Sequence, residues 1–262
     1  MDFEKIKGKT IELAREVGIY IQQEAMGFDH QRVEEKGLND LVSYVDKTAE
    51  KKLVQGLKII LPDAGFITEE GTATSNKEDY LWIIDPLDGT TNFTHGLPIY
   101  AISIALMHHD EIVAGVVYEL NKDEMFWAVK GGGAWLNDKQ IQVSARAKLS
   151  ESLLATGFPY YDFEQMAAYL NILNELMQST HGLRRMGSAA VDLAYVACGR
   201  FEGFFEYNLK SWDVAAGCLL VKEAGGQVTD FSLGDNFLFG KEIIAGGSSF
   251  NEMQSVIAKH WQ

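Results

Sequence analysis

Two carboxylates three residues apart, Asp85 and Asp88, follow directly on an apolar run, Leu81-Trp82-Ile83-Ile84. The run predicts a buried strand, because apolar and β-branched residues favour that position. Pro86 fixes its own φ and keeps Asp85 extended, so the strand holds the first carboxylate in place. The three-residue step then lets both side chains turn toward one point at the strand end. Carboxylates gathered in this way are ligands for a divalent metal ion.

The residues that follow are suited to holding an anion. Gly89 permits a backbone bend or a close approach to a ligand, and Thr90 and Thr91 come next. The backbone N–H groups of these three residues can open a helix and face a phosphate there. The segment therefore predicts a site for a divalent metal and a phosphate group. A strand end with a polar turn and a capping threonine is the plainer alternative.

Three other segments carry acidic residues of the same kind. They are Glu69-Glu70 after a second strand candidate, Asp213 at the start of a helix of small residues, and Lys36, Asp40 and Asp46 within one short segment. Each has an ordinary explanation by itself, as a solvated turn, a helix cap or a surface lysine. Magnesium prefers carboxylate oxygens and water, often with a substrate phosphate. All these segments together favour a magnesium site.

The elements that must position these residues change in character along the chain. In the N-terminal part, apolar residues at helical spacing predict one helix up to about Met26 and another over 46–60. Strands are expected at 66–68, 81–84, 99–107, 111–118 and 124–129, with a hairpin or bulge at the glycines 131–133. Further on, helices are expected at 164–178, 189–198, 212–224 and from about 250, and strands at 201–207, 227–229 and near 243. We expect a single unit over 1–262, with an N-terminal α+β half (about 1–145) and a C-terminal α/β half (about 146–262).

Composition limits the classes of partner. The chain of 262 residues has a formal net charge of −14, and such a surface repels nucleic acid and anionic lipid, so neither is expected as a partner. A phosphate ester would be repelled as well unless cations offset the carboxylates, which favours a metal-dependent site over one lined by arginine. The N-terminus lacks the basic start and apolar core of a signal peptide, and no apolar run approaches membrane-spanning length. We therefore expect a cytoplasmic protein.

Taken together, these motifs resemble those of the inositol monophosphatase family, the lithium-sensitive magnesium phosphatases. Asp-Pro-Leu-Asp-Gly-Thr-Thr-Asn-Phe (85–93) is similar to the family's first signature, and Trp-Asp-Val-Ala-Ala-Gly (212–217) to its second. The segment from Asp40 to Asp46 looks like a third motif, with Ser43 where threonine is frequent, and Thr68 stands before Glu69-Glu70 where the family has glycine. The resemblance covers essentially the whole chain. It implies an α+β fold, the layered αβαβα sandwich of the inositol monophosphatase and fructose-1,6-bisphosphatase type.

The resemblance also implies a ligand set for two or three magnesium ions. The first ion would be held by Glu69, Asp85 and the Leu87 carbonyl, and the second by Asp85, Asp88 and Asp213. A third, weaker ion would use Glu69, with Lys36 and Glu70 as neighbours of that ion or of the phosphate. The catalytic residues would be Thr90, Asp46 and Glu69, with Thr90 and Asp46 deprotonating the attacking water. Gly89, Thr90 and Thr91 would hold the phosphate oxygens.

The implied reaction is hydrolysis of a small phosphorylated polyol, sugar or nucleotide by direct in-line attack of a metal-activated water, with no phosphoenzyme. Glu206 is expected to bind ring hydroxyls, and Arg184, Ser188 and Ala189 resemble the segment beside the substrate sugar. Further candidates for lining the pocket are Phe158, Tyr160, Tyr161 and Arg185. Inositol 1-phosphate is the first choice of substrate, with fructose 1,6-bisphosphate, NADP(H) and 3′-phosphoadenosine nucleotides as alternatives. The resemblance also implies a homodimer.

Two other classes of protein remain open. An aspartyl-phosphate phosphatase carries a similar Asp-x-Asp-Gly-Thr motif, but its carboxylates stand two residues apart, whereas here the spacing is three and Pro86 intervenes. A non-catalytic regulatory binding module is the alternative from a different class. The presence of every expected metal ligand and of Thr90 argues against it.

Overall fold

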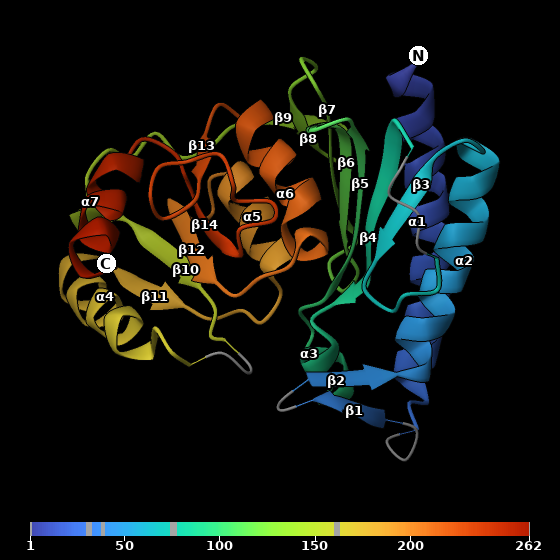
Figure 1. Ribbon diagram of the computed structural model, residues 1–262, viewed down its shortest axis with the longest axis horizontal. Coiled ribbons are helices and arrows are strands. Elements are labelled where there is room, and N and C mark those ends of the chain that lie inside the picture. The colour runs from blue at the N-terminus through green and yellow to red at the C-terminus, as the bar shows by residue number, and fades with distance from the viewer. Residues whose placement is uncertain (1, 30–32, 38–39, 74–77, 160–162, 262) are drawn as a thin grey trace.

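Helices and sheets alternate in layers across the molecule (Figure 1). The computed structural model describes residues 2–29, 33–37, 40–73, 78–159 and 163–261. From right to left in Figure 1 the order is a helical layer, a sheet, a helical layer, a second sheet and a helical layer. The expected αβαβα sandwich is confirmed.

The first sheet has seven strands in the order β3-β4-β5-β6-β7-β8-β9. They are β3 (Gly65–Thr68), β4 (Tyr80–Asp88), β5 (Ala101–His108), β6 (Glu111–Glu119), β7 (Glu124–Val129), β8 (Ala134–Leu136) and β9 (Lys139–Ile141). β3 runs parallel to β4, and the other neighbours are antiparallel. The turn between β7 and β8 holds Gly131 and Gly133, both with positive φ, as a tight turn requires. β8 and β9 are too short to show an apolar alternation, and the sequence did not predict them.

Helices α1 (Phe3–Met26) and α2 (Tyr44–Ile60) cover the outer face of this sheet. Their buried apolar residues recur at helical spacing, among them Val17 and Ile21 on α1 and Leu53 and Leu57 on α2. These side chains join one hydrophobic core with the sheet residues that point toward them. The opposite faces of both helices carry the charged residues that the amphipathic pattern predicts.

Helices α5 (Ala189–Ala197) and α6 (Ser211–Glu223) lie between the two sheets and are buried almost throughout. A helix covered on both sides needs small and apolar residues in every direction. A Cβ on Gly217 would lie 2.5 Å from Leu193 Cβ, and a Cβ on Gly115 would lie 3.1 Å from the Ala216 backbone. Glycine at these two positions lets α6 approach α5 on one side and β6 on the other.

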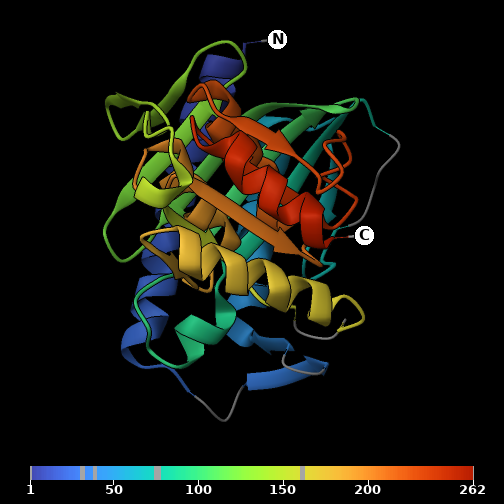
Figure 2. The ribbon, with the colours of Figure 1, turned by 90° about the vertical axis from the view of Figure 1, so that its left-hand side faces the viewer.

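The second sheet has five strands in the order β11-β10-β12-β14-β13. They are β10 (Leu153–Thr156), β11 (Gly182–Arg184), β12 (Gly203–Tyr207), β13 (Gln227–Thr229) and β14 (Glu242–Gly246). Helices α4 (Met166–Ser179) and α7 (Phe250–His260) cover its outer face, which is turned to the viewer in Figure 2. A separate apolar cluster fills the space beneath them.

Three shorter elements complete the fold. A hairpin of β1 (Val33–Gly37) and β2 (Asp40–Ser43) and the short helix α3 (Thr90–Thr94) lie together at the lower end of the molecule in Figure 1. A 3₁₀ turn (Leu149–Glu151) precedes β10. No strand was predicted for the charged hairpin, which contacts α3 and α2. No helix in the described part of the chain is long and apolar enough to cross a membrane.

Candidate active site

A bulge at the end of β4 places Asp85 and Asp88 on the same side of the sheet. In the register with β5, Asp85 pairs with Ser103 and Asp88 with Ala101, so β4 carries one residue more than its partner across this step. Residues three apart on a regular strand face opposite sides, and one extra residue reverses that relation. Pro86 sits within the bulge, where the strand has no need of its missing N–H. We expected the strand to end before the carboxylates. In the structure it continues through both of them.

Asp88 is held by the first residues of α5, which lie about a hundred positions away in sequence. Its Oδ2 accepts hydrogen bonds from Ser188 Oγ (2.7 Å) and from the backbone N–H of Ala190 (2.6 Å). Asn92 secures this junction, because its Nδ2 donates to the carbonyls of Ile99 and Met186, both at 2.8 Å. The Ser188 hydroxyl therefore orients a carboxylate of the site.

Asp213 reaches the same place from the first turn of α6. The Lys210 backbone N–H donates to Asp213 Oδ2 (2.6 Å), so one carboxylate oxygen caps the helix. Ser103 Oγ on β5 donates to the Trp212 carbonyl at 3.2 Å and ties the start of α6 to the first sheet. The capping role and the ligand role expected for Asp213 are thus compatible.

The turn that carries Glu69 and Glu70 is fixed by a carboxylate that the sequence analysis did not single out. Glu50 on α2 is fully buried and accepts from the N–H groups of Glu70 (2.7 Å) and Thr72 (2.9 Å) and from the Thr72 hydroxyl (2.7 Å). The Glu69 N–H donates to the Ile84 carbonyl of β4 at 3.3 Å. The turn is held firmly although Thr68 replaces the glycine that the resemblance led us to expect.

Three carboxylates of the site crowd together and repel one another. One oxygen from each of Asp85, Asp88 and Asp213 lies within 4.8 Å of the others. Burial raises the pKa of Asp85 well above its usual range, and the charges of Glu69, Asp88 and Asp213 raise it further. Burial likewise raises the pKa of Asp88 to about 6, and burial and Asp88 raise the pKa of Asp213 to about 7. A divalent cation would remove this repulsion, so the donor set fits a hard, oxygen-preferring metal.

A hydroxyl and a buried carboxylate stand beside the cluster. Thr90 Oγ1 donates to Asp46 Oδ1 at 2.7 Å and lies 3.0 Å from the Leu87 carbonyl. Oδ2 of Asp46 accepts from the backbone N–H and the hydroxyl of Ser43. Ser43 is the N-cap of α2, so this helix begins at Tyr44, two residues earlier than expected. Asp46 is completely buried, and its burial raises its pKa.

Gly89 connects the bulge to α3 in a conformation that a side chain would oppose. Its φ is 99°, and a Cβ would lie 3.0 Å from the Ile99 carbonyl oxygen and 3.2 Å from the Gly187 carbonyl oxygen. The expectation that Gly89 permits a bend and that Thr90 opens a helix is confirmed. Thr90 and Thr91 form the first turn of α3.

A small cavity of about 70 Å³ extends from Asp88 and Asp213 to the residues expected to contact substrate. Its lining includes Ser188, Ala189 and Glu206. Arg185 lines it as well, whereas the side chain of Arg184 is exposed and donates to the Leu183 carbonyl at 3.0 Å. The structure thus places Arg185 at the cavity and Arg184 away from it.

Several other predicted residues have different outcomes. Phe158 is exposed near Arg185, with the guanidinium carbon 5.8 Å from the ring centroid. Lys36 and Asp40 belong to β1 and β2, but their side chains lie outside the described part of the chain, as do Tyr160 and Tyr161 entirely. One buried carboxyl of the cavity, Asp192, was missed, because a single Asp among the small and apolar residues of α5 carries no spacing signal.

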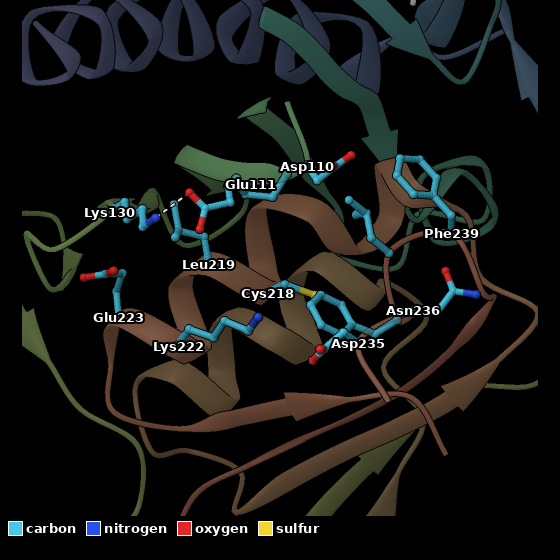
Figure 3. Close-up of a pocket in the computed structure, with 13 residues that line it drawn as sticks. Asp110, Glu111, Lys130, Cys218, Leu219, Lys222, Glu223, Asp235, Asn236 and Phe239 are labelled. Carbon is cyan, nitrogen blue, oxygen red and sulfur yellow. Dashed lines mark hydrogen bonds and ion pairs between the residues drawn. The ribbon is translucent and has the colours of Figure 1, made fainter. Parts of the chain in front are cut away.

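A larger cavity, of about 320 Å³, lies elsewhere, between the second half of α6, the start of β6 and residues 235–239 (Figure 3). Figure 3 shows Cys218, Leu219 and Lys222 of α6 along it, with Lys130 and Glu111 joined at its edge. No residue predicted for the site lines this cavity. We locate the chemistry at the smaller cavity because two of the clustered carboxylates, Asp88 and Asp213, line it.

The fold and the site define a layered α+β protein with a buried, oxygen-lined candidate metal centre. The chain belongs to the inositol monophosphatase family, whose model matches residues 2–262. It is 45% identical over 249 residues to the putative Nus factor SuhB of Neisseria meningitidis (94% of this chain, 95% of the relative). It is 40% identical over 237 residues to an inositol-1-monophosphatase of Mesorhizobium japonicum (90% and 89%).

Solved structures agree with this assignment. The suhB protein of Bartonella henselae superposes with a TM-score of 0.91 at 41% identity, covering 96% of this chain and 98% of that one. The inositol monophosphatase (IMPase) of Thermotoga maritima gives a TM-score of 0.86 at 36% identity, covering 95% of each chain.

Proposed function

We propose that this protein is a magnesium-dependent phosphomonoester hydrolase with inositol 1-phosphate as its preferred substrate. The observation that carries the proposal is the placement of the Thr90–Asp46 pair beside the cluster of Asp85, Asp88 and Asp213. The family and the relative from Mesorhizobium japonicum support the reaction class. A cytoplasmic homodimer, as expected from the sequence, is part of the proposal.

Magnesium would be held by the ligands named from the sequence. They are Glu69, Asp85 and the Leu87 carbonyl for one ion, Asp85, Asp88 and Asp213 for a second, and Glu69 for a third and weaker one. When bound, the ions neutralise the phosphate oxygens and lower the pKa of water. Burial and the charges of Glu69, Asp88 and Asp213 raise the pKa of Asp85, and a bound cation would offset this repulsion.

The chain's own residues would move protons and orient the ester. The Thr90 hydroxyl donates to Asp46, so its lone pairs face away from that carboxylate and can accept a proton from the attacking water. Water attacks phosphorus in line with the ester oxygen, the P–O ester bond breaks, and the alcohol oxygen takes up a proton. The N–H groups of Gly89, Thr90 and Thr91 would hold the phosphate oxygens. Glu206 would accept hydrogen bonds from hydroxyls of the alcohol.

The test is phosphate release from inositol 1-phosphate, fructose 1,6-bisphosphate, NADP and 3′-phosphoadenosine 5′-phosphate, each across a magnesium titration. We expect magnesium-dependent release, with the highest kcat/KM for inositol 1-phosphate. A higher kcat/KM for one of the other esters would move the assignment to that substrate. No release from any of them by folded protein would contradict the hydrolase. A trapped phosphoenzyme would revive the aspartyl-phosphate alternative.

Magnesium affinity is expected to rise steeply with pH. In the absence of a cation the pKa of Asp88 is raised to about 6 and that of Asp213 to about 7. A raised pKa means that the folded protein holds more protons than the unfolded chain between about pH 4 and 7, so the metal-free protein loses stability as pH rises through this range. Magnesium must displace those protons, and each proton released strengthens binding about tenfold per pH unit. Calorimetric titration from pH 5.5 to 8 measures this slope, and a flat affinity over that range would contradict it.

The names of several relatives give a second candidate function. Proteins of Neisseria meningitidis and Pseudomonas aeruginosa that are 45% and 41% identical to this chain are called a putative Nus factor and a Nus factor, respectively. This favours a role in a transcription complex, in addition to hydrolysis or in place of it, and corresponds to the binding-module alternative. A variant without hydrolase activity that still restores the phenotype of a gene deletion would favour that role.

A further inference from the structure

Asp192 is a buried carboxyl of the site cavity that the proposed reaction does not use. It lies on α5, is 1% exposed, and lines the cavity together with Glu206 and Asp88. It stands one helical turn after Ser188, whose hydroxyl holds Asp88, so both residues share the face of α5 that is turned to the site. The neighbours of Asp192 on this helix are alanine, valine and leucine, so an aspartate here has no evident packing role.

The carboxyl of Asp192 is not satisfied by its surroundings. Its Oδ1 is buried and has no hydrogen-bond partner among the described residues. Burial raises the pKa of Asp192 well above its usual range, and the charges of Glu206 and Asp88 raise it further, against the opposing effect of Arg185. A buried oxygen without a partner destabilises a protein, so such a group calls for an explanation. A ligand hydroxyl in the cavity would supply the missing partner.

Glu206 is fixed on another wall of the cavity. A Cβ on Gly157 would lie only 2.0–2.1 Å from the Glu206 carboxylate oxygens, so the carboxylate fills the space that any other residue at 157 would need. The hydroxyls of Thr156 and Tyr169 hold the Phe205 carbonyl at 2.9 and 3.2 Å. Tyr169 also donates to the Gly157 carbonyl at 3.0 Å. Glu206 therefore presents its carboxylate from a rigid wall.

We propose that Asp192 is a further specificity-determining residue, which binds a substrate hydroxyl beside the one expected at Glu206 and thereby strengthens the preference for a polyhydroxylated alcohol. A hydroxyl group both donates and accepts, so it can pair with a carboxyl group in either protonation state. The cavity's 70 Å³ corresponds to about five to seven water molecules, which is the scale of the hydroxyl-bearing edge of one small ring. The inference rests on the proposed hydrolase and specifies its substrate class.

The kinetic test compares a substrate with hydroxyls with one that has none. Asp192→Leu keeps the approximate size of the side chain and removes its polar atoms, and Asp192→Asn keeps a donor and an acceptor. With magnesium present, we expect Asp192→Leu to lower kcat/KM for inositol 1-phosphate 10- to 100-fold, mainly through a higher KM. Its kcat/KM for p-nitrophenyl phosphate should stay within threefold of the wild-type value. Asp192→Asn should restore most of the loss. The melting temperature of Asp192→Leu should equal or exceed that of the wild type, because an unpaired buried oxygen has been removed.

Glu202→Gln provides a matched control. Glu202 is also a carboxyl with 1% exposure, but it accepts from Leu153 N (2.6 Å) and Arg146 Nη1 (2.7 Å), away from the cavity. This control should lower the melting temperature and leave unchanged the ratio of kcat/KM for inositol 1-phosphate to kcat/KM for p-nitrophenyl phosphate. An equal loss on both substrates in Asp192→Leu, or no loss on either, would overturn the inference.

A binding measurement separates this inference from the hydrolase itself. Inositol 1-phosphate and, separately, inorganic phosphate are titrated calorimetrically into Thr90→Ala and Thr90→Ala/Asp192→Leu. We expect Kd for inositol 1-phosphate to rise at least tenfold in the double variant while Kd for phosphate stays the same. Failure of the wild type to release phosphate would count against the hydrolase alone. Equal Kd values for inositol 1-phosphate in the two variants would count against Asp192.

Discussion

Asp88→Asn is expected to lower the rate of phosphate release by roughly a thousandfold or more, which corresponds to about 4 kcal/mol of transition-state stabilisation. The substitution removes one of the proposed charged metal ligands and keeps the shape of the side chain. The asparagine oxygen can still accept from Ser188 Oγ and Ala190 N, so the contact between β4 and the start of α5 should persist. Steady-state phosphate release at saturating magnesium measures the loss, and calorimetry should show weaker magnesium binding.

The stability of the same variant distinguishes a lost ligand from a damaged fold. Without magnesium, Asp88→Asn should melt at or above the wild-type temperature near neutral pH, because one of three crowded carboxylates is gone. Asp123→Asn is the matched control. Asp123 is an exposed aspartate with φ 54°, a conformation that asparagine tolerates, and it accepts from Tyr118 far from the cluster. Near-normal turnover of Asp88→Asn with an unchanged melting curve would contradict the assignment of the metal site.

Thr90→Ala is expected to lower kcat by about a hundred- to a thousandfold with little change in KM. The variant removes the hydroxyl that would link the attacking water to Asp46 but keeps the backbone N–H that would face the phosphate. Asp46 also loses one of its hydrogen bonds, so the free energy of unfolding should fall by about 1–2 kcal/mol. Kinetics with inositol 1-phosphate, together with a melting curve, measure both effects.

Thr90→Ser is the control for this prediction, because it retains the hydroxyl and loses only a methyl group. Its kcat should stay within about tenfold of the wild type. If serine and alanine at position 90 gave the same rate, the hydroxyl would have no part in proton transfer. The raised pKa of Asp46 adds a second readout, since a protonated Asp46 could not take up the proton passed on by Thr90 and the rate should fall at acid pH.

Part of this site could be predicted from the sequence because its information is local. Asp85, Asp88 and Gly89 lie within five residues, and the apolar run before them and the glycine and threonines after them indicate where the strand lies and the next helix starts. Asp213 could be placed at the start of a helix for the same reason. The bulge in β4 could not be predicted, because it depends on pairing with β5 and on the register of Ser103 and Ala101.

Contacts between distant segments could not be predicted either, because they too depend on how separate parts of the chain pack together. Glu50 looked like one charged residue among several on an amphipathic helix, yet it is fully buried and holds the turn after Glu69. Arg184 and Arg185 are adjacent in sequence, and only the path of the chain after β11 decides which of them reaches the cavity. Asp192 carries no spacing signal, and its role depends on Glu206 lying across the cavity.

The sequence by itself determined the family, the identity of the metal-ligand candidates and the order of most helices and strands. These follow from residue types and short-range periodicity, which the chain carries wherever it folds. Tertiary structure alone decided that the carboxylates of β4 and α6 meet, that α5 orients Asp88, and that Asp192 and Glu206 line one cavity. The physical reason is that these relations arise from sheet register and from the packing of α5 and α6 between two sheets, where each element's position depends on all its neighbours.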